Sequence, residues 1–566
     1  MRLLLLTHAF NSLAQRIFLD LQVQGHTVSV EFDIADAVTE EALTLFKPHL
    51  VVAPFLKRRL PEAVWGRVPC FIIHPGPPGD RGPSSLDWAI KEGASRWGVT
   101  VLQAEGELDG GPVWAHEAFA MRPASKSSLY RHEVTEAAVR ALGTALERFE
   151  AGAGPLFRPE GEAIRARPAM RQVDRAIRWE TDGVEEILRK LRAADGQPGV
   201  AAHLFGEPCR LYDPRPESGA FRGEAGQALG RREGALLVGA RDGAFWVGQA
   251  RREGRIKLPA SQAFPEGSAA LPELPSETGW WRSPQDTWQD ISYEERGPVG
   301  LLRFEFSHGA MGTEQCRRLR QAVEWSLGRP ARVLVLAGGP DFWSNGMHLN
   351  LIEASPSPAD ASWENINALD DLAETILGAQ DRLVVAALQG NAGAGGCFLA
   401  RAADEVWVRQ GVVLNPHYKN MGNLHGSEFW TYLLPARVGE AGARAILRHR
   451  LPMGAEEAVR TGFYDALLPG DPAGFHAELA RRAEKLAGES FFARLEAKRG
   501  RRVADEARKS LAAYRSEELA EMRRNFFGFD PSYHVARARF VRKDPPAWTP
   551  RHLALHRELG WRVPQP

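Results

Sequence analysis

Residues 342–347 read FWSNGM and residues 391–397 read NAGAGGC, and these two stretches decide the fold of the second half of the chain. A continuous apolar run, at 332–336 and at 383–388, precedes each stretch and is typical of a buried strand. Glycines permit sharp turns, and a turn that opens a helix presents free backbone N–H groups. The pattern predicts two such turns in an α/β domain, although close packing of strand and helix would also explain the glycines.

The segments around these turns continue an α/β rhythm. A further strand is expected at 299–304, with helices at 314–326 and 367–379. Beyond residue 430 the chain is mostly helical and charged. We therefore expect an α/β domain over 289–470 and a helical region over 471–566.

The first half of the chain predicts a separate α/β domain over 1–160. A parallel, Rossmann-like sheet is expected because short apolar runs alternate with an amphipathic segment. A smaller β-rich, OB-like subdomain is expected over 161–265, followed by a Pro-rich linker over 266–288. The expected strands are 3–6, 28–30, 50–53, 70–73, 235–239, 244–248 and 255–257, and the expected helices are 12–24 and 184–194.

Composition narrows the class of protein. The 566 residues are 44% hydrophobic with a formal net charge of zero, so neither nucleic acid nor a membrane is an expected partner. The four cysteines form no C-x-x-C pair, which argues against a zinc site and suits a reducing cytoplasm. We expect no metal and a cytoplasmic location.

His74 and Asp109 are the candidate catalytic residues of the first domain. His74 ends an expected strand, where open α/β sheets place their ligands, and Asp109 lies in a Gly-rich turn. A carboxylate beside a histidine can orient the ring and change its proton affinity. The alternative is that a histidine before Pro75 only caps a turn.

Residues 72–114 resemble the formyltetrahydrofolate-dependent formyltransferases and hydrolases, and the segment 177–199 resembles the start of their C-terminal subdomain. The resemblance implies 10-formyltetrahydrofolate as substrate and assigns folate binding to Ile72, Arg81, Gly82 and Asp109. One departure stands out, because Ile72 occupies the place of the family's catalytic Asn. Losing one oxyanion donor costs roughly 3 kcal/mol of transition-state stabilisation in other enzymes.

The ordered pair of glycine turns resembles the crotonase (enoyl-CoA hydratase/isomerase) family over about residues 290–470. By this resemblance, the N–H groups of Met347 and Gly395 form an oxyanion hole for a thioester, and Gly346, Gly395 and Gly396 contact coenzyme A. The catalytic glutamates of hydratases are replaced, by Phe398 and by Tyr418. Tyr418 and Glu428, ten residues further on, are therefore the candidate acid and base.

A basic, aromatic segment near the C-terminus holds Arg542 and Lys543. Crotonases often place a C-terminal basic residue on a coenzyme A phosphate, so these two residues are candidate phosphate ligands. The alternative is an exposed tail.

The fusion of the two modules resembles a group of hydrogenase maturation factors. That resemblance implies formyl transfer from the folate to coenzyme A, decarbonylation of formyl-CoA, and delivery of carbon monoxide to the [NiFe]-hydrogenase maturation machinery. Two alternatives remain: a formyltetrahydrofolate hydrolase fused to an acyl-CoA enzyme, and a carrier-binding scaffold without catalysis, which Ile72 and Phe398 would suit.

Overall fold

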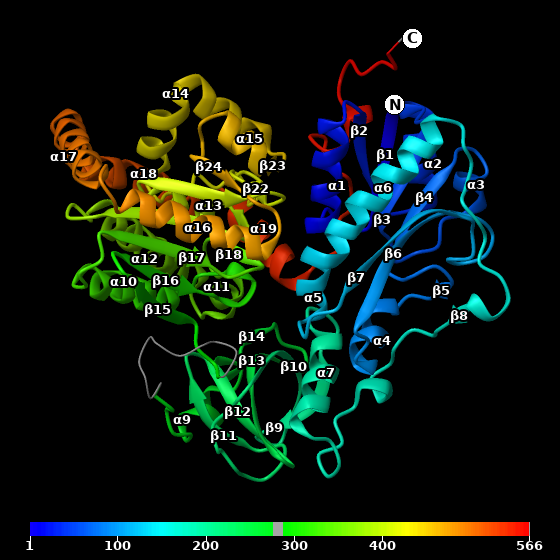
Figure 1. Ribbon diagram of the computed structural model, residues 1–566, viewed down its shortest axis with the longest axis horizontal. Helices are drawn as coiled ribbons and strands as arrows, with labels where there is room; N and C mark the ends of the chain where they lie inside the picture. Colours follow the sequence, from blue (N-terminus) through cyan, green and yellow to red (C-terminus); the bar gives the residue numbers. More distant parts are fainter. Residues whose placement is uncertain (276–286, 565–566) are drawn as a thin grey trace.

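The computed structural model describes residues 1–275 and 287–564, which form two α/β domains and a small β-rich domain (Figure 1). The two α/β domains lie side by side, and the β-rich domain lies below both in this view. Within the described residues, none of the helices has the length and apolar character needed to cross a bilayer. The same residues contain no group of three or more His, Cys, Asp or Glu side chains arranged to hold a metal ion.

The N-terminal domain is built on a six-stranded sheet. Its elements are β1 Arg2–Thr7, α1 Ser12–Val23, β2 Thr27–Phe32, α2 Asp36–Phe46, β3 Leu50–Phe55, α3 Glu62–Trp65, β4 Cys70–His74, β5 Asp80–Arg81, α4 Ser85–Glu92, β6 Arg96–Gln103, β7 Val113–Ala120, α5 Lys126–Leu129, the π-helical turn η1 Tyr130–Val134 and α6 Thr135–Glu150. The strand order is β2-β1-β3-β4-β6-β7. The first four strands in this order are parallel, as predicted, whereas β6 and β7 extend the sheet antiparallel. Helices α1 and α6 cover one face, and α2 covers the other.

The β-rich domain follows through a short strand, β8 Arg165–Ala166, that pairs with β5. Its elements are α7 Val184–Ala194, β9 Val200–Leu204, β10 Glu207–Pro216, β11 Ala228–Arg232, β12 Ala235–Ala240, β13 Gly243–Arg252 and β14 Leu258–Pro259. The antiparallel strands run in the order β11-β12-β13-β10-β9 and pack on the apolar face of α7. The predicted strand at 255–257 is wrong, because these residues follow the turn at Gly254 and pairing resumes only at Leu258.

The segment predicted as a linker, 266–288, packs on the β-rich domain where it is described. After α8 Ala260–Ala263 and α9 Pro265–Ala269, the backbone of residues 272–274 bonds to Arg231 on β11. Trp288 is buried against Leu237 and Trp246. Residues 276–286 lie outside the described residues.

The second α/β domain holds two sheets. Its elements are β15 Ile291–Arg296, β16 Val299–Phe304, α10 Thr313–Leu327, β17 Val333–Gly338, β18 Phe342–Ser344, α11 Leu349–Ala354, α12 Pro358–Leu377, β19 Leu383–Leu388, β20 Asn391–Gly393, α13 Gly395–Arg401, β21 Glu405–Arg409, β22 Val413–Asn415, α14 Trp430–His449, β23 Met453–Gly454, α15 Ala455–Arg460 and β24 Ala466–Leu468. One sheet runs β15-β16-β17-β19-β21-β24, and a smaller one runs β18-β20-β22-β23. The smaller sheet carries both glycine turns, because one turn follows β18 and the other follows β20.

The C-terminal region is helical, as predicted, and then returns to the N-terminal domain. Its helices are α16 Pro472–Leu486, α17 Phe491–Arg508, α18 Leu511–Phe527 and α19 Ser532–Arg542. Beyond them the chain crosses to the edge strand β2, where the Val30 N–H donates to the Leu553 carbonyl at 2.9 Å. The buried Glu31 carboxylate binds Thr549, His556 and Arg557. The last part of the described chain therefore packs on the N-terminal domain (Figure 1).

Candidate functional sites

The first candidate site lies at the end of β4, where His74 is 4% exposed. Its Nδ1 atom is 3.6 Å from Asp109 Oδ2, so the structure brings the predicted pair together. The Gly82 N–H donates to the same Asp109 oxygen at 3.1 Å. Asp109 has a positive φ of 51°, a strained conformation that aims its carboxylate at both partners.

Asp80 is a residue of this site that the sequence analysis missed. Its Oδ2 atom lies 2.9 Å from His74 Nε2, so each ring nitrogen of His74 faces a carboxylate. The other oxygen, Oδ1, is buried and has no hydrogen-bond partner among the described residues. A side chain at Gly76 would overlap both His74 and Asp80, so the glycine permits this contact. The place of Asp80 directly before Arg81, in the segment that resembles the formyltransferases, was the one sequence feature that could have pointed to it.

The other predicted folate residues are less closely joined to the pair. Ile72 lies two residues before His74 on β4, and it therefore faces the same side of the sheet. Its apolar side chain supplies no hydrogen bond to this side. Arg81 forms an ion pair with the exposed Glu107.

The second candidate site lies where the two glycine turns meet. Strands β18 and β20 pair in parallel, which brings the turns that follow them together. A Cβ atom at Gly346 would lie 3.4 Å from the Gly395 N atom. Gly346 has a φ of 74°, and its carbonyl accepts the Met311 N–H at 2.9 Å, which fixes the turn before Met347. At Gly396, a side chain would overlap the Ser344 carbonyl.

Tyr418 and Glu428 are in direct contact beside these turns. The Tyr418 hydroxyl donates to Glu428 Oε2 at 2.7 Å, and both side chains are buried. The other carboxylate oxygen, Oε1, is 2.0 Å from the position that a Cβ atom at Gly395 would occupy. The Tyr418 ring stacks on Phe398 with centroids 5.2 Å apart. The structure thus places Gly395, Tyr418 and Glu428 in one buried cluster.

Burial controls the protonation of this cluster. It raises the pKa of Glu428 to about 8, and the negative charge of Asp370 adds to the rise. Burial, together with the Glu428 charge, also raises the pKa of Tyr418 well above its usual value. Near neutral pH, Tyr418 therefore keeps its proton, and Glu428 can exchange one.

Arg542 and Lys543 lie apart from this cluster, in a cavity of about 660 Å³ between the β-rich domain and helices α11 and α19. Arg542 binds Glu353 at 3.1 Å and is 62% exposed. Burial lowers the pKa of Lys543. The cavity is strongly basic, because its lining includes Arg251, Arg252, Arg255, Lys257, Arg542 and Lys543.

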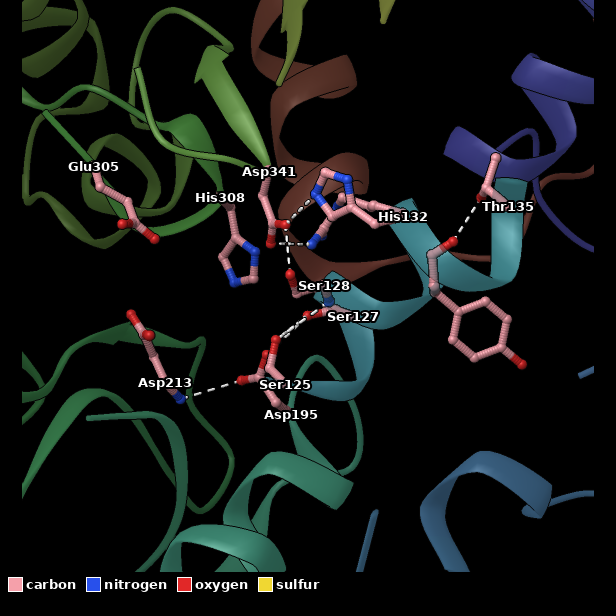
Figure 2. A network of polar contacts seen from close by, with 12 residues as sticks. Ser125, Ser127, Ser128, His132, Thr135, Asp195, Asp213, Glu305, His308 and Asp341 are labelled. Carbon is pink, nitrogen blue, oxygen red and sulfur yellow. Dashed lines mark hydrogen bonds and ion pairs between the residues drawn. The ribbon is translucent and has the colours of Figure 1, made fainter. Parts of the chain in front are cut away.

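A polar interface joins the N-terminal domain to the second site, and the sequence analysis did not identify it. Asp341 directly precedes β18, and Figure 2 shows it beside His132 and Ser128 from the N-terminal domain. Its carboxylate lies 2.7 Å from Ser128 Oγ, 2.8 Å from Arg131 Nη1 and 3.0 Å from His132 Nε2. Nearby, the His308 carbonyl accepts the side-chain N–H of Asn345, the residue before Gly346, at 2.8 Å.

Comparison with known proteins places the chain in a family. It is 51% identical over 562 residues to "Hydrogenase maturation factor HoxX" of Bradyrhizobium diazoefficiens, covering 98% of this chain and 97% of that protein. The chain belongs to the HoxX/HypX family of hydrogenase maturation factors. A crystal structure of HypX from Aquifex aeolicus in complex with tetrahydrofolic acid, 44% identical, superposes with a TM-score of 0.96 over 100% of both chains.

The constituent modules of this HoxX/HypX family member are also recognised separately. The family models for formyl transferase, for the formyl transferase C-terminal domain and for enoyl-CoA hydratase/isomerase match residues 30–146, 169–266 and 311–551. The methionyl-tRNA formyltransferase of Stenotrophomonas maltophilia is 27% identical over 45% of this chain and 79% of that protein. The two-module fold class predicted from the sequence is confirmed.

Proposed function

We propose that this protein makes carbon monoxide for the [NiFe]-hydrogenase active site, by moving a formyl group from 10-formyltetrahydrofolate to coenzyme A and then decarbonylating formyl-CoA. The observation that carries the proposal is the buried contact between Tyr418 and Glu428 beside Gly395. A hydratase would need two acidic side chains here. The pair present suits a reaction that only moves one proton.

The first step is assigned to the site at His74. His74 takes the thiol proton as the new C–S bond forms, and it returns that proton to the folate nitrogen as the C–N bond breaks. Asp80 holds the ring at Nε2, and Nδ1, which is 3.6 Å from Asp109 and so not hydrogen-bonded to it, is the nitrogen that takes the proton. Ile72 stands where the family has an oxyanion donor and cannot donate a hydrogen bond. Formyl transfer therefore relies on the positioning of the reactants more than on stabilisation of the oxyanion charge.

The second step is assigned to Glu428. The Glu428 carboxylate takes the formyl proton, the C–S bond breaks to release carbon monoxide, and the same proton returns to the thiolate sulfur. The raised pKa makes this carboxylate a stronger base than an ordinary one. Tyr418 donates to Oε2 and so keeps Oε1 directed at the turn of Gly395. The N–H groups of Met347 and Gly395 bind the thioester oxygen.

Coenzyme A fits the basic cavity as the acceptor. Its phosphates carry negative charge, and guanidinium groups such as Arg251, Arg252 and Arg542 form strong, charge-assisted bonds to phosphate. Arg542 is available for this role because its side chain is 62% exposed, although it also pairs with Glu353. The cavity lies between domains, which suits a carrier that serves two sites.

Carbon monoxide release tests the proposal directly. Purified protein with 10-formyltetrahydrofolate and coenzyme A should release carbon monoxide, measured by haemoglobin absorbance. Tyr418→Phe and Glu428→Gln should each lower the rate by about 10-fold or more. Each variant loses the buried, charge-assisted hydrogen bond between the two side chains, and a hydrogen bond to a charged group contributes about 1.5 kcal/mol or more, which corresponds to at least that factor in rate. Both variants should bind coenzyme A normally. Release of formate in place of carbon monoxide would support the hydrolase alternative, and ligand binding without turnover would support the scaffold.

A further inference from the structure

Two further carboxylic acids, Asp370 on α12 and Glu518 on α18, are buried next to Glu428. Both have 0% exposure, although neither belongs to a catalytic motif of the sequence. They reach the same short segment, residues 427–431, from two different helices. Burying a carboxyl group costs free energy unless the group is well hydrogen-bonded, so the bonds that these two acids make indicate their role.

The backbone of this segment is held by carboxyl groups at three successive N–H groups. The Ser427 N–H donates to Glu428 Oε2 at 3.1 Å, and the Glu428 N–H donates to Asp370 Oδ1 at 2.9 Å. The Phe429 N–H donates to Glu518 Oε2 at 2.9 Å. Glu428 and Phe429 both have left-handed φ values, 61° and 58°. Such strain persists only where surrounding bonds enforce it.

The Ser427 hydroxyl contacts both Asp370 and Glu518. Its Oγ atom lies 2.8 Å from Asp370 Oδ2 and 3.3 Å from Glu518 Oε2. A hydroxyl has one proton, so it cannot donate fully to both oxygens. Either one acid supplies a proton to the contact, or the longer bond is largely lost. The charge of Asp370 acts on both Glu428 and Glu518, and that of Glu518 acts on Glu428, so the three acids titrate as a coupled group.

We propose that Asp370 and Glu518 are positioning residues of the second site, which fix the left-handed backbone of Glu428 and surround its carboxyl group with negative charge. The catalytic role of this arrangement rests on the proposed function, since removal of a formyl proton requires a well-placed base of raised basicity.

The surrounding charges agree with this assignment. After burial, the Asp370 charge is the largest influence that raises the pKa of Glu428, and Glu518 adds to it, whereas the Tyr418 hydrogen bond opposes the rise. Burial raises the pKa of Asp370 to about 6 and that of Glu518 to about 7. Cys316 is also near and holds its proton, because burial raises its pKa.

One cation whose charge acts on Asp370 is largely committed to other carboxylates. Arg515, on the same helix as Glu518, binds Asp371 at 2.6 Å and Glu374 at 2.8 Å. Its charge lowers the pKa of Asp370 but does not reverse the effect of burial. The cluster is thus left with a net excess of carboxyl groups around Glu428.

Infrared titration of the full-length protein without folate or coenzyme A tests the proposal. The C=O band of the protonated Glu428 carboxyl group is identified by its loss in Glu428→Gln. In the wild type this band should disappear with a midpoint near pH 8. In Asp370→Asn, which keeps the side-chain shape, the midpoint should fall by about one pH unit or more, because a neighbouring charge is removed.

Two variants make the result specific. Glu518→Gln should lower the midpoint in the same direction by a smaller amount. Asp360→Asn, in the first turn of α12, removes an exposed charge ten residues before Asp370, so it should leave the midpoint in place. An unchanged midpoint in folded Asp370→Asn, or an equal fall in Asp360→Asn, would overturn the proposal. A titration that behaves as expected in a protein that releases no carbon monoxide would overturn the proposed function alone.

Discussion

Replacing Gly395 by alanine should stop the second reaction while leaving the fold in place. The new Cβ atom would lie 2.0 Å from Glu428 Oε1, whereas ordinary contacts begin at 3.4 Å. The carboxyl group would have to retreat by about 1.4 Å, and Oε2 would then lose the bonds from Tyr418 and from the Ser427 N–H. A misplacement of about 1 Å can cost about 100-fold in rate, so we expect carbon monoxide release to fall by about that factor or more.

The assay for Gly395→Ala is carbon monoxide release at saturating coenzyme A, with the thermal midpoint and coenzyme A affinity measured in parallel. Gly328→Ala is the matched control, because it lies at the C-cap of α10 in the same domain with a φ of −80° and its nearest neighbour at 3.3 Å. The control should keep its activity. If Gly395→Ala released carbon monoxide within about threefold of the wild-type rate, the contact between Glu428 and this turn would not be the catalytic geometry.

Two further predictions concern the first site and the cavity. Asp80→Asn keeps the shape beside His74 Nε2 but removes the charge, so the rate of formyl transfer to coenzyme A should fall by about 10- to 100-fold. Tetrahydrofolate binding, measured by calorimetry, should change little. An unaffected transfer rate would show that Asp80 has no role in the reaction. Arg542→Ala should weaken coenzyme A binding by about tenfold, and by a smaller factor at high salt. Arg539→Ala, an exposed position on the same helix, should leave coenzyme A binding unchanged. Equal losses of affinity in both variants would indicate a general effect of charge.

The buried strands were the most predictable part of the fold. The strands at 299–304 and 383–388 and the helix at 184–194 match the structure at both ends, because each is a continuous apolar or amphipathic segment with clear boundaries. The helix predicted at 367–379 begins earlier, at Pro358, since proline at the first helical position starts a helix that a purely apolar pattern does not reveal.

The candidate second site was only partly accessible from the sequence. Tyr418 and Glu428 are ten residues apart, and the resemblance to crotonases was enough to select them. Asp370 and Glu518 lie 57 and 91 residues from Ser427 along the chain, and only the packing of α12 and α18 brings them to it. Each stands beside a second acidic residue in a helical segment, Asp371 and Glu517, which is typical of a solvated helix face, so a buried acid there gives no signal before the tertiary contacts are known.

The interface between the domains gives a physical reason for joining both modules in one chain. Desolvation alone would raise the pKa of Asp341, but the hydrogen bond from His132 and the charge of Arg131 outweigh it and hold the pKa well below its usual range. Both partners belong to the N-terminal domain, while Asp341 leads directly into β18 and the turn at Gly346. Without that domain, Asp341 would be exposed to water and would lose its bonds to Ser128, Arg131 and His132, so the loop that leads into β18 would lose the contacts that hold it. The formyltransferase-like domain therefore stabilises the geometry of the crotonase-like site in addition to carrying a site of its own.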